Sequence, residues 1–305
     1  MKRFIIKIFL LLILSTALAT FIMLLVKNEV SKNSHEVNVA FAYEKLEELK
    51  DTNKIVIISG SNGAFSINSQ IISDTISMPV VNTSTHAGIG VRMQFEIYKD
   101  LLKKGDIIVF CPEYYSDKSR LYGEGALFRI LSTHIPSAYF KMSAKQWWYT
   151  FKHIALHFTE SLKVADCKPF EGPYSARSIN EFGDISCKRE PQDFNTTYVF
   201  KGNMDKETLS YYQYIHDYSK KHGFYLVYLP PCLNESNFLH QKSQIDSLDV
   251  FMEQNNIPFQ STPSRYVFPD SLFFDTPYHM TTKGAELRTL VLTEDLKQLI
   301  ETCHF

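Results

Sequence analysis

Short, continuously apolar runs separated by helical patterns constrain the fold of this 305-residue chain most strongly. A strand that is covered on both faces of a sheet is apolar at every position, and the run Ile55-Val56-Ile57-Ile58 is of this kind. Such strands in alternation with helices predict a parallel sheet with right-handed crossovers. We therefore expect an α/β fold, with a mostly parallel five-stranded sheet in a three-layer α/β/α sandwich. The strands are expected at Ile55–Ile58, in 78–84, at 107–111, in 224–231 and in 257–262, with helices at 65–77, 90–105, 206–223, 243–256 and 283–300.

The N-terminus carries an uncharged apolar run, Ile8–Val26, that is long enough to cross a bilayer as a helix. Lysine and arginine residues precede the run, which favours an N-terminus inside the cytoplasm. The Ala-Leu-Ala sequence at 17–19 resembles a signal-peptide cleavage site, but the apolar run continues beyond it as "FIMLLV". We expect an uncleaved signal anchor, and hence a single-pass protein of the inner or plasma membrane. The C-terminal domain would then lie outside the cytoplasm.

Three regions follow from these patterns. Residues 1–26 form a cytoplasmic stub and the anchor, residues 27–51 a charged helical connector, and residues 52–305 the α/β domain. The strand and helix rhythm breaks at about 121–205, which we interpret as an insertion that covers one end of the sheet. Within it, Trp147 and Trp148 indicate core packing or contact with the membrane interface more than a sugar platform. The formal net charge of −1 gives no electrostatic footprint for nucleic acid.

Five cysteines fit a compartment outside the cytoplasm. Cys167 and Cys187 bracket a polar loop and are the preferred disulfide, whereas Cys111 and Cys232 are either a second pair or two buried thiols. The cysteines and histidines lack zinc-site spacing, so no metal is expected. The turn "SGSNGAFS" lacks both the dinucleotide fingerprint and the P-loop ending, so no nucleotide cofactor is expected either.

Polar and small residues gather where the expected sheet would bring strand ends together. Ser61 follows the first strand, Gly88 and Gly90 follow the second, and Asp275 and His279 precede the last helix. A serine hydroxyl needs a base within hydrogen-bond reach, and the base needs an acid that orients it. Backbone amides at a glycine-rich turn can stabilise the oxyanion that forms. Each feature alone also has a structural reading, since Ser61 could simply cap a helix.

Four stretches together resemble the SGNH (GDSL-like) hydrolase superfamily, whose fold is flavodoxin-like. They are "IISGSNGAFSI", "NTSTHAGIG", "GDIIVFCPEYY" and "FFDTPYHMTTKGAELRT", with a weaker similarity in "INEFGDI". More closely, the chain resembles membrane-tethered SGNH-like proteins associated with acylation of cell-envelope glycans. The resemblance implies that Ser61 is the nucleophile, His279 the base and Asp275 its orienting acid. It further implies an oxyanion hole made by the amide of Ser61 and that of Gly88 or Gly90.

The chain departs from the family pattern at two places. The third block lacks the usual asparagine and reads Cys-Pro-Glu-Tyr at 111–114. Either Asn62, Asn82 or Tyr114 substitutes for it, or the hole is weaker, and we expect Asn82, Glu113 and Tyr114 to contact substrate. Glu113 and Tyr114 could instead brace the site from behind or form a surface pair. The gap between the expected acid and base is three residues long and contains a proline, which disfavours a helical turn there.

The resemblance implies a serine acyltransferase or esterase. It would act on O-acyl groups, O-acetyl first among them, of a cell-envelope or surface polysaccharide through an acyl-serine intermediate. Expected partners are the bilayer, a glycan or acyl-ester substrate and a membrane-bound O-acyltransferase. The alternative is a catalytically inactive SGNH-fold scaffold or an accessory partner of such a transferase.

Overall fold

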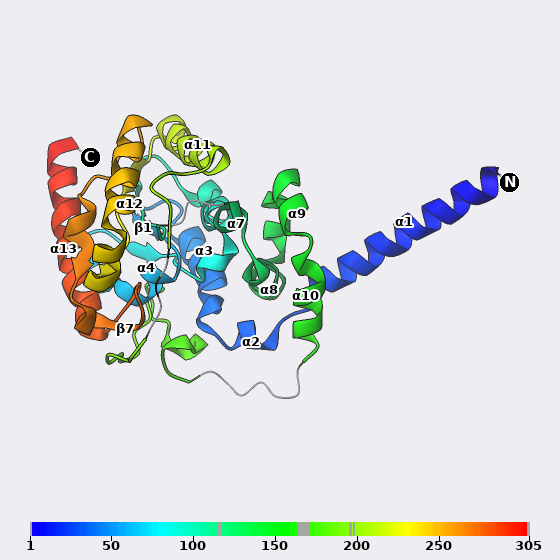
Figure 1. The fold of residues 1–305 in the computed structure, drawn as a ribbon, viewed down its shortest axis with the longest axis horizontal. Helices are drawn as coiled ribbons and strands as arrows, with labels where there is room; N and C mark the ends of the chain where they lie inside the picture. Colours follow the sequence, from blue (N-terminus) through cyan, green and yellow to red (C-terminus); the bar gives the residue numbers. More distant parts are fainter. Residues whose placement is uncertain (1, 115–117, 164–170, 195–196, 198, 304–305) are drawn as a thin grey trace.

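A computed structural model describes residues 2–114, 118–163, 171–194, 197 and 199–303. Within these residues the main sheet has four strands in the order β2-β1-β3-β4, and every pair is parallel. The strands are β1 (Ile55–Ile58), β2 (Val80–Asn82), β3 (Ile107–Phe110) and β4 (Tyr225–Tyr228). The predicted α/β class and parallel sheet are therefore confirmed (Figure 1).

The remaining elements are mostly helices packed around this sheet. The α-helices are α1 (Lys2–Leu25), α2 (Glu29–Lys32), α3 (Asn38–Glu48), α4 (Ser61–Ser66), α5 (Ser69–Ile76), α6 (Val91–Glu96), α7 (Lys118–Tyr122), α8 (Gly125–His134), α9 (Ala144–Thr150), α10 (His153–Ser161), α11 (Lys206–His222), α12 (Glu235–Gln254) and α13 (Thr282–Cys303). Short strands β5 (Leu233–Asn234) and β6 (Val267–Phe268) form one pair, and β7 (Phe273–Thr276) and β8 (His279–Met280) another. Four short 3₁₀ helices matter below: η2 (Ala87–Ile89), η4 (Pro136–Lys141), η6 (Gly172–Tyr174) and η7 (Ala176–Ser178).

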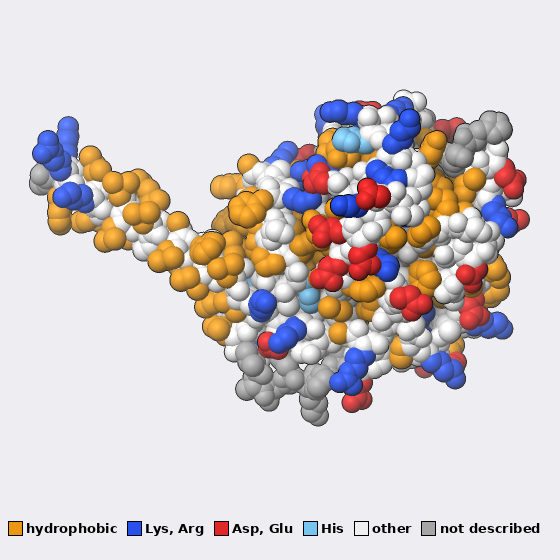
Figure 2. Space-filling view, turned by 180° about the vertical axis from the view of Figure 1, so that it is seen from behind, with side chains coloured by type: hydrophobic (Ala, Val, Ile, Leu, Met, Phe, Trp, Pro, Cys, Tyr) orange, Lys and Arg blue, Asp and Glu red, His pale blue; other side chains and the backbone are white. Residues whose placement is uncertain are grey.

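Helix α1 projects away from the folded domain (Figure 1), and its surface is almost entirely apolar (Figure 2). In the described part of the chain it is the one helix long and apolar enough to span a membrane, and none of its apolar window is buried by protein. A helix with an apolar surface on all sides is stable only in an apolar surrounding. The predicted apolar N-terminal helix is thus present, and it is long and apolar enough to span a membrane.

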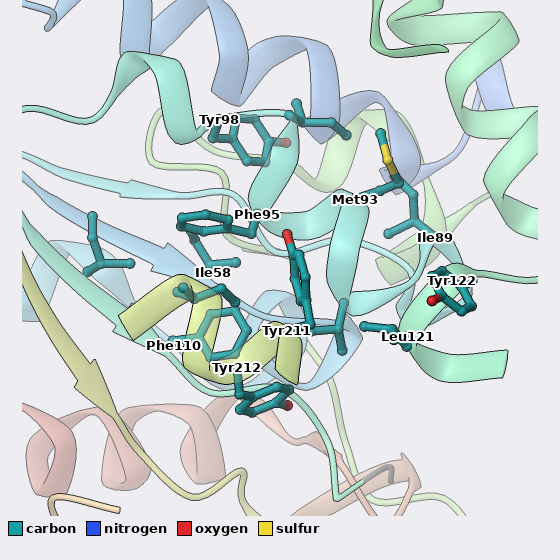
Figure 3. Packing of buried hydrophobic residues seen from close by; sticks show 14 of the residues in the cluster. Ile58, Ile89, Met93, Phe95, Tyr98, Phe110, Leu121, Tyr122, Tyr211 and Tyr212 are labelled. Carbon is teal, nitrogen blue, oxygen red and sulfur yellow. The ribbon is translucent and has the colours of Figure 1, made fainter. Parts of the chain in front are cut away.

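Alternate residues of the central strands point into two different cores. Val56 and Ile58 of β1 pack with helices α3, α6, α8 and α11, and Figure 3 shows part of this cluster around Ile58 and Phe110. Ile55 and Ile57 pack on the other side with α5 and α13. Because side chains alternate along a strand, helices on both faces require an apolar residue at each position. This explains the continuous apolar run in the sequence.

The expected fifth strand is not formed. Residues 257–262 lie beside β4, where the amide of Gln260 donates to the carbonyl of Tyr228 at 2.9 Å. The side-chain oxygen of Gln260, in place of a backbone carbonyl, accepts the hydrogen bond from the Tyr228 amide. Pro258 has no amide hydrogen to donate. The sheet therefore ends at β4, with four strands where the sequence predicted five.

Two predicted helices are interrupted. The helix expected at 65–77 begins earlier, at Ser61, and divides into α4 and α5 at Ile67, whose backbone is extended. The amide of Asn68 at this break donates to Thr289 of α13 at 2.9 Å. The helix expected at 90–105 ends as an α-helix at Glu96. At the first of these breaks a contact with a distant part of the chain has overridden the local helical pattern.

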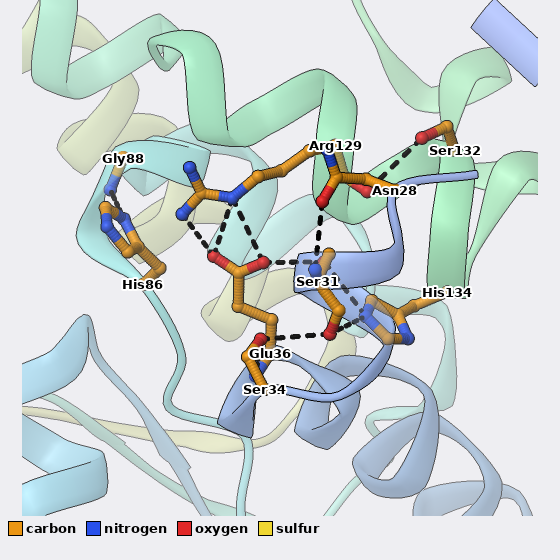
Figure 4. A network of polar contacts seen from close by, with 9 residues as sticks. All are labelled: Asn28, Ser31, Ser34, Glu36, His86, Gly88, Arg129, Ser132 and His134. Atoms are coloured by element: carbon orange, nitrogen blue, oxygen red, sulfur yellow. Dashed lines mark hydrogen bonds and ion pairs between the residues drawn. The ribbon is translucent and has the colours of Figure 1, made fainter. Parts of the chain in front are cut away.

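The expected connector at 27–51 belongs to the packed domain. Val39, Ala42 and Leu46 of α3 are fully buried in the core beside the sheet. Before α3, the buried carboxylate of Glu36 accepts hydrogen bonds from Arg129 of α8 and from Ser31 (Figure 4). The chain that leaves α1 is therefore fastened to the domain from its first residues.

The structure describes Cys111 and Cys232 as buried free thiols, in agreement with one of the two alternatives. Cys187 is also a free thiol. Its expected partner Cys167 lies outside the described residues.

Candidate active site

Ser61 is the first residue of α4, directly after β1 and a tight turn at Gly60. A side chain at Gly60 would collide with the carboxylate of Glu113, so glycine here allows Glu113 to lie against the turn. The hydroxyl-bearing residue is partly exposed, whereas the rest of α4 is buried. The amide of Ser61, in the first turn of the helix, has no partner within the helix and is available to a ligand.

Helix α4 is held in place by hydrogen bonds to its first turn. The amide of Asn62 donates to Glu113 at 3.1 Å, and the Asn62 side chain donates to Ser59 at 2.6 Å and to the carbonyl of Cys111 at 2.9 Å. From α13, the fully buried Arg288 donates to the carbonyl of Asn62 at 3.0 Å. Asn62 and Glu113 are therefore occupied in positioning α4, and Glu113 is a brace as one reading of the sequence expected.

Asp275 and His279 form a hydrogen-bonded pair in the β7–β8 hairpin. Asp275 Oδ1 lies 2.8 Å from His279 Nδ1. The intervening residues form the turn of the hairpin, where the Thr276 hydroxyl accepts hydrogen bonds from the amides of Tyr278 and His279 at 3.3 and 3.1 Å. A hairpin turn accommodates Pro277, which a helical turn would not. The three-residue gap is thus compatible with the acid–base pair.

The His279 ring stacks on Phe65 of α4, with ring centroids 4.0 Å apart and planes 10° from parallel. Phe65 follows Ser61 by one helical turn, so the two side chains lie on the same face of α4. The imidazole is therefore beside the face of the helix that begins with Ser61. No hydrogen bond joins Ser61 and His279 in the described structure, and such bonds are often long in the absence of substrate.

Tyr174, in the insertion, is a site residue that the sequence analysis missed. Its hydroxyl donates to Asp275 Oδ2 and lies 3.2 Å from His279 Nδ1. Burial pushes the pKa of Asp275 upward, but the hydrogen bond and charge of His279 and the hydrogen bond from Tyr174 together lower it. Asp275 is thus kept ionised, as an orienting acid must be. A tyrosine in an aperiodic loop carries no sequence signal for this role.

The expected oxyanion donors at the second block are engaged within the protein. The amide of Gly88 donates to His86 Nδ1 at 3.0 Å, and the amide of Gly90 donates to the carbonyl of Ala87 at 3.0 Å. Gly90 adopts a φ of +87° against the backbone of Gly123, which accounts for glycine there. Of the expected backbone donors, the amide of Ser61 remains open to substrate.

Asn82 and Tyr114 do not face the site. Asn82 is fully buried and its side chain donates to Asp184 at 2.8 Å and to the carbonyl of Gly63 at 3.2 Å, while it accepts from the amide of Ser84. Tyr114 packs in the core with its ring centroid 5.3 Å from that of Phe200. Both residues stabilise the domain from behind the strand ends and offer no contact to a substrate in this arrangement.

His35, from the segment after α1, is a second imidazole at the site. Its ring packs edge-on against Phe65 and Tyr174, at centroid distances of 5.6 and 5.5 Å. The adjoining chain pairs with the insertion through an antiparallel bridge between Ser34 and Ser175. Burial lowers the pKa of His35 to about 4, so the ring is neutral near pH 7. No residue spacing in the sequence indicates that His35 lies here.

Comparisons of the chain with family models, with curated proteins and with solved structures found no match.

The buried His35 predicts a loss of stability in mild acid. Between about pH 4 and 6.5 the unfolded chain binds a proton at His35 that the folded chain does not, so the free energy of unfolding decreases as the pH falls through this window. The full loss is about 3 kcal/mol. We expect His35→Phe to remove this part of the pH dependence, measured by urea unfolding in mild detergent at pH 7.5 and 4.5.

The matched control is His240→Phe on the exposed side of α12, which should retain the pH dependence of the unchanged protein. Equal pH dependence in the unchanged protein and His35→Phe would contradict the prediction.

Proposed function

We propose that this protein is a serine acyl-transfer enzyme in which Ser61 is the nucleophile, His279 the general base and Asp275 the acid that orients it. The observation that carries the proposal is the Asp275–His279 pair, joined at 2.8 Å and stacked on the helix that starts with Ser61. The resemblance of the sequence blocks to SGNH hydrolases gives independent support. A nucleophile, a base and an orienting acid are the minimal set for acyl transfer through serine.

In the proposed reaction the Ser61 oxygen attacks the carbonyl carbon of an acyl ester and His279 Nε2 accepts the serine proton. Asp275 and Tyr174 contact Nδ1 of the ring, so Nε2 is the nitrogen that remains to accept the serine proton. The amide of Ser61 stabilises the oxyanion. The ester alcohol leaves with the proton from His279 and an acyl-serine remains. Water or a sugar hydroxyl then attacks it, with His279 again the base.

The proposed substrate class is an O-acylated, first of all O-acetylated, cell-envelope or surface polysaccharide. A helix such as α1 would keep the domain at the membrane, where a membrane-bound O-acyltransferase could supply the acyl group. An esterase and a transferase share the acyl-serine and differ in the acceptor. Incubation with an acetyl ester and candidate glycans separates them: free acetate alone indicates an esterase, and an acylated glycan indicates a transferase.

The second candidate is a scaffold or accessory protein with an inactive site. The amides of Gly88 and Gly90 favour the scaffold, because both are hydrogen-bonded within the protein. An oxyanion hole with the Ser61 amide as its one backbone donor would stabilise an oxyanion less than a hole with two donors.

A fluorophosphonate probe distinguishes the two candidates, because it labels only an activated serine. We expect the unchanged protein to be labelled, Ser61→Ala to be unlabelled and His279→Ala to react about a thousandfold more slowly, because the serine loses its base. The measurement is the rate of labelling followed by mass spectrometry of the modified peptide.

Ser243→Ala, an exposed serine of α12, is the matched control and should react as the unchanged protein does. A folded protein that resists labelling at Ser61 would favour the scaffold.

Tyr174→Phe tests the hydrogen bond that supports Asp275. Loss of a hydrogen bond to a charged group costs about 1.5–3 kcal/mol, so we expect kcat for an acetyl ester to fall by roughly tenfold or more. KM should change little, since Tyr174 acts through Asp275 and His279 and not on the substrate. Steady-state kinetics provide both constants. Tyr149→Phe, on α9, serves as the control and should leave both constants unchanged. A higher KM with an unchanged kcat in Tyr174→Phe would refute a positioning role.

We further propose that α1 is an uncleaved signal anchor in the inner or plasma membrane, with residues 27–305 outside the cytoplasm. The basic residues before the apolar run support this orientation. A phosphatase reporter that is active only after export, fused behind Phe305, should therefore be active in cells. An inactive reporter, together with an active cytoplasmic reporter at the same place, would reverse the orientation.

A further inference from the structure

The insertion exposes large apolar side chains on the side of the domain next to α1. Figure 2 shows apolar side chains that continue from α1 onto the adjoining surface of the domain. A soluble surface rarely gathers so many of them in one segment. The α9–α10 face, as we call it, consists of Phe140 (95% exposed), Trp148 (78%), Leu162 (59%), Phe151 (56%) and Leu156 (49%).

Both helices of this face bury polar side chains and expose large apolar ones, although α10 also buries Ile154 and exposes Glu160. In α9 the polar Gln146 is fully buried, whereas Trp148 is exposed. In α10 the polar side chains of His157 and Ser161 point inward, whereas Leu156 points outward. A helix at a water-exposed surface shows the opposite distribution. The exposed Trp148 and Leu156 are therefore unusual for helices that face water alone.

The buried polar side chains of α9 and α10 each make a hydrogen bond within the protein. The Gln146 side chain donates to the carbonyl of Tyr122 at 2.8 Å. Ser161 accepts a hydrogen bond from the Asn28 side chain at 3.1 Å and lies 3.3 Å from His157 Nδ1. These bonds fix which side of α9 and α10 faces outward, and Asn28 ties α10 to the segment that leaves α1.

The orientation of the face relative to α1 is also fixed. The Tyr139 hydroxyl donates to the carbonyl of Leu24 in the last turn of α1 at 3.2 Å. The amide of Asn28 donates to Thr133 of α8 at 2.9 Å. An apolar cleft joins the end of α1 to the base of the face and is lined by residues of both, among them Phe21, Leu24, Leu25, Tyr139, Phe140 and Trp147.

We propose that the α9–α10 face lies in the interfacial region of the membrane leaflet from which α1 emerges. The proposal rests on the proposed spanning of the bilayer by α1 and not on the chemistry of Ser61. If α1 crosses the bilayer, residues that pack against its last turns lie at the depth of the headgroups. Tryptophan and phenylalanine prefer this depth, and helices with one apolar face bind in the plane of the interface.

Charge favours lipid over a second copy of the chain as the occupant. Residues 136–163 contain four lysines and one glutamate. Lys141 and Lys145 are paired with Asp100 and Glu207, but Lys152 lies on the face itself, 5.7 Å from the ring of Tyr149. A basic residue beside exposed aromatic rings suits anionic headgroups. Two copies of such a face would place like charges together.

The chain has only two tryptophans, which makes the test direct. Trp147→Phe leaves Trp148 as the single fluorophore of the full chain, reconstituted in vesicles of phosphatidylcholine and phosphatidylglycerol. We expect lipids brominated near the headgroup to quench its emission and aqueous iodide to quench it weakly. The control carries Trp147→Phe, Trp148→Phe and Leu239→Trp. Leu239 is 65% exposed on α12, which lies at the opposite end of the domain from α1 (Figure 1), and its replacement should show the reverse pattern.

Phe140→Trp in the background that carries Trp147→Phe and Trp148→Phe reports on a second position of the face, and Trp148→Phe alone, which keeps Trp147 beside the end of α1, shows whether Trp147→Phe has disturbed the fold. Alkaline co-flotation with the vesicles is measured on each variant and reports integration of α1. Strong iodide quenching at Trp148 and Phe140→Trp, without bromine quenching, in protein that co-floats would overturn the proposal and point to a protein partner on this face. Failure to co-float would overturn its premise. Neither result bears on labelling of Ser61.

Discussion

The packing of the six-residue helix α4 against the C-terminal part of the chain is the constraint on which the candidate site depends. Ser66 donates to the carbonyl of Tyr278 at 2.8 Å and Arg288 donates to the carbonyl of Asn62 at 3.0 Å, although more than 200 residues separate the partners in each pair. Burying a guanidinium group costs free energy unless it is hydrogen-bonded. Arg288 therefore stabilises the fold only when α4 is in place, which couples the position of Ser61 to the docking of α13. The stacking of His279 on Phe65 follows from this docking.

The parts of the fold that were predictable are those in which local sequence and tertiary surroundings agree. β1 has the expected bounds, because a strand with helices on both faces must be apolar throughout, and few other structures produce such a run. The expected fifth strand failed because the Gln260 side chain replaces a backbone acceptor, which no periodicity reveals. The helix expected at 65–77 failed at Ile67, a residue with adequate helical propensity whose extended backbone is set by contacts with α13. Both predictions were wrong because the structure there depends on a residue far away in the sequence, Tyr228 for Gln260 and Thr289 for Asn68.

The same distinction holds for the candidate site. Asp275 and His279 are four positions apart, so their pairing could be anticipated, and the hairpin turn explains how Pro277 is accommodated. Tyr174 and His35 could not be anticipated, because they reach the site from an aperiodic loop and from the segment after α1. The glycines at 88 and 90 were expected to offer amides to an oxyanion. The structure instead uses those amides to close η2, one of them with the side chain of His86, because a buried amide needs a hydrogen-bond partner.

The connection to α1 and the construction of the candidate site involve the same stretch of chain. Residues 28–36 leave α1, bond to α8 through Asn28 and Glu36, and end with His35 against Phe65 and Tyr174. The antiparallel bridge of Ser34 to Ser175 places the insertion loop that carries Tyr174 on the same segment. A connector that served only as a tether would need neither buried partners nor a ring in the site. This segment has both, so the residues that connect α1 to the domain also contact Tyr174, which in turn donates to Asp275 beside His279.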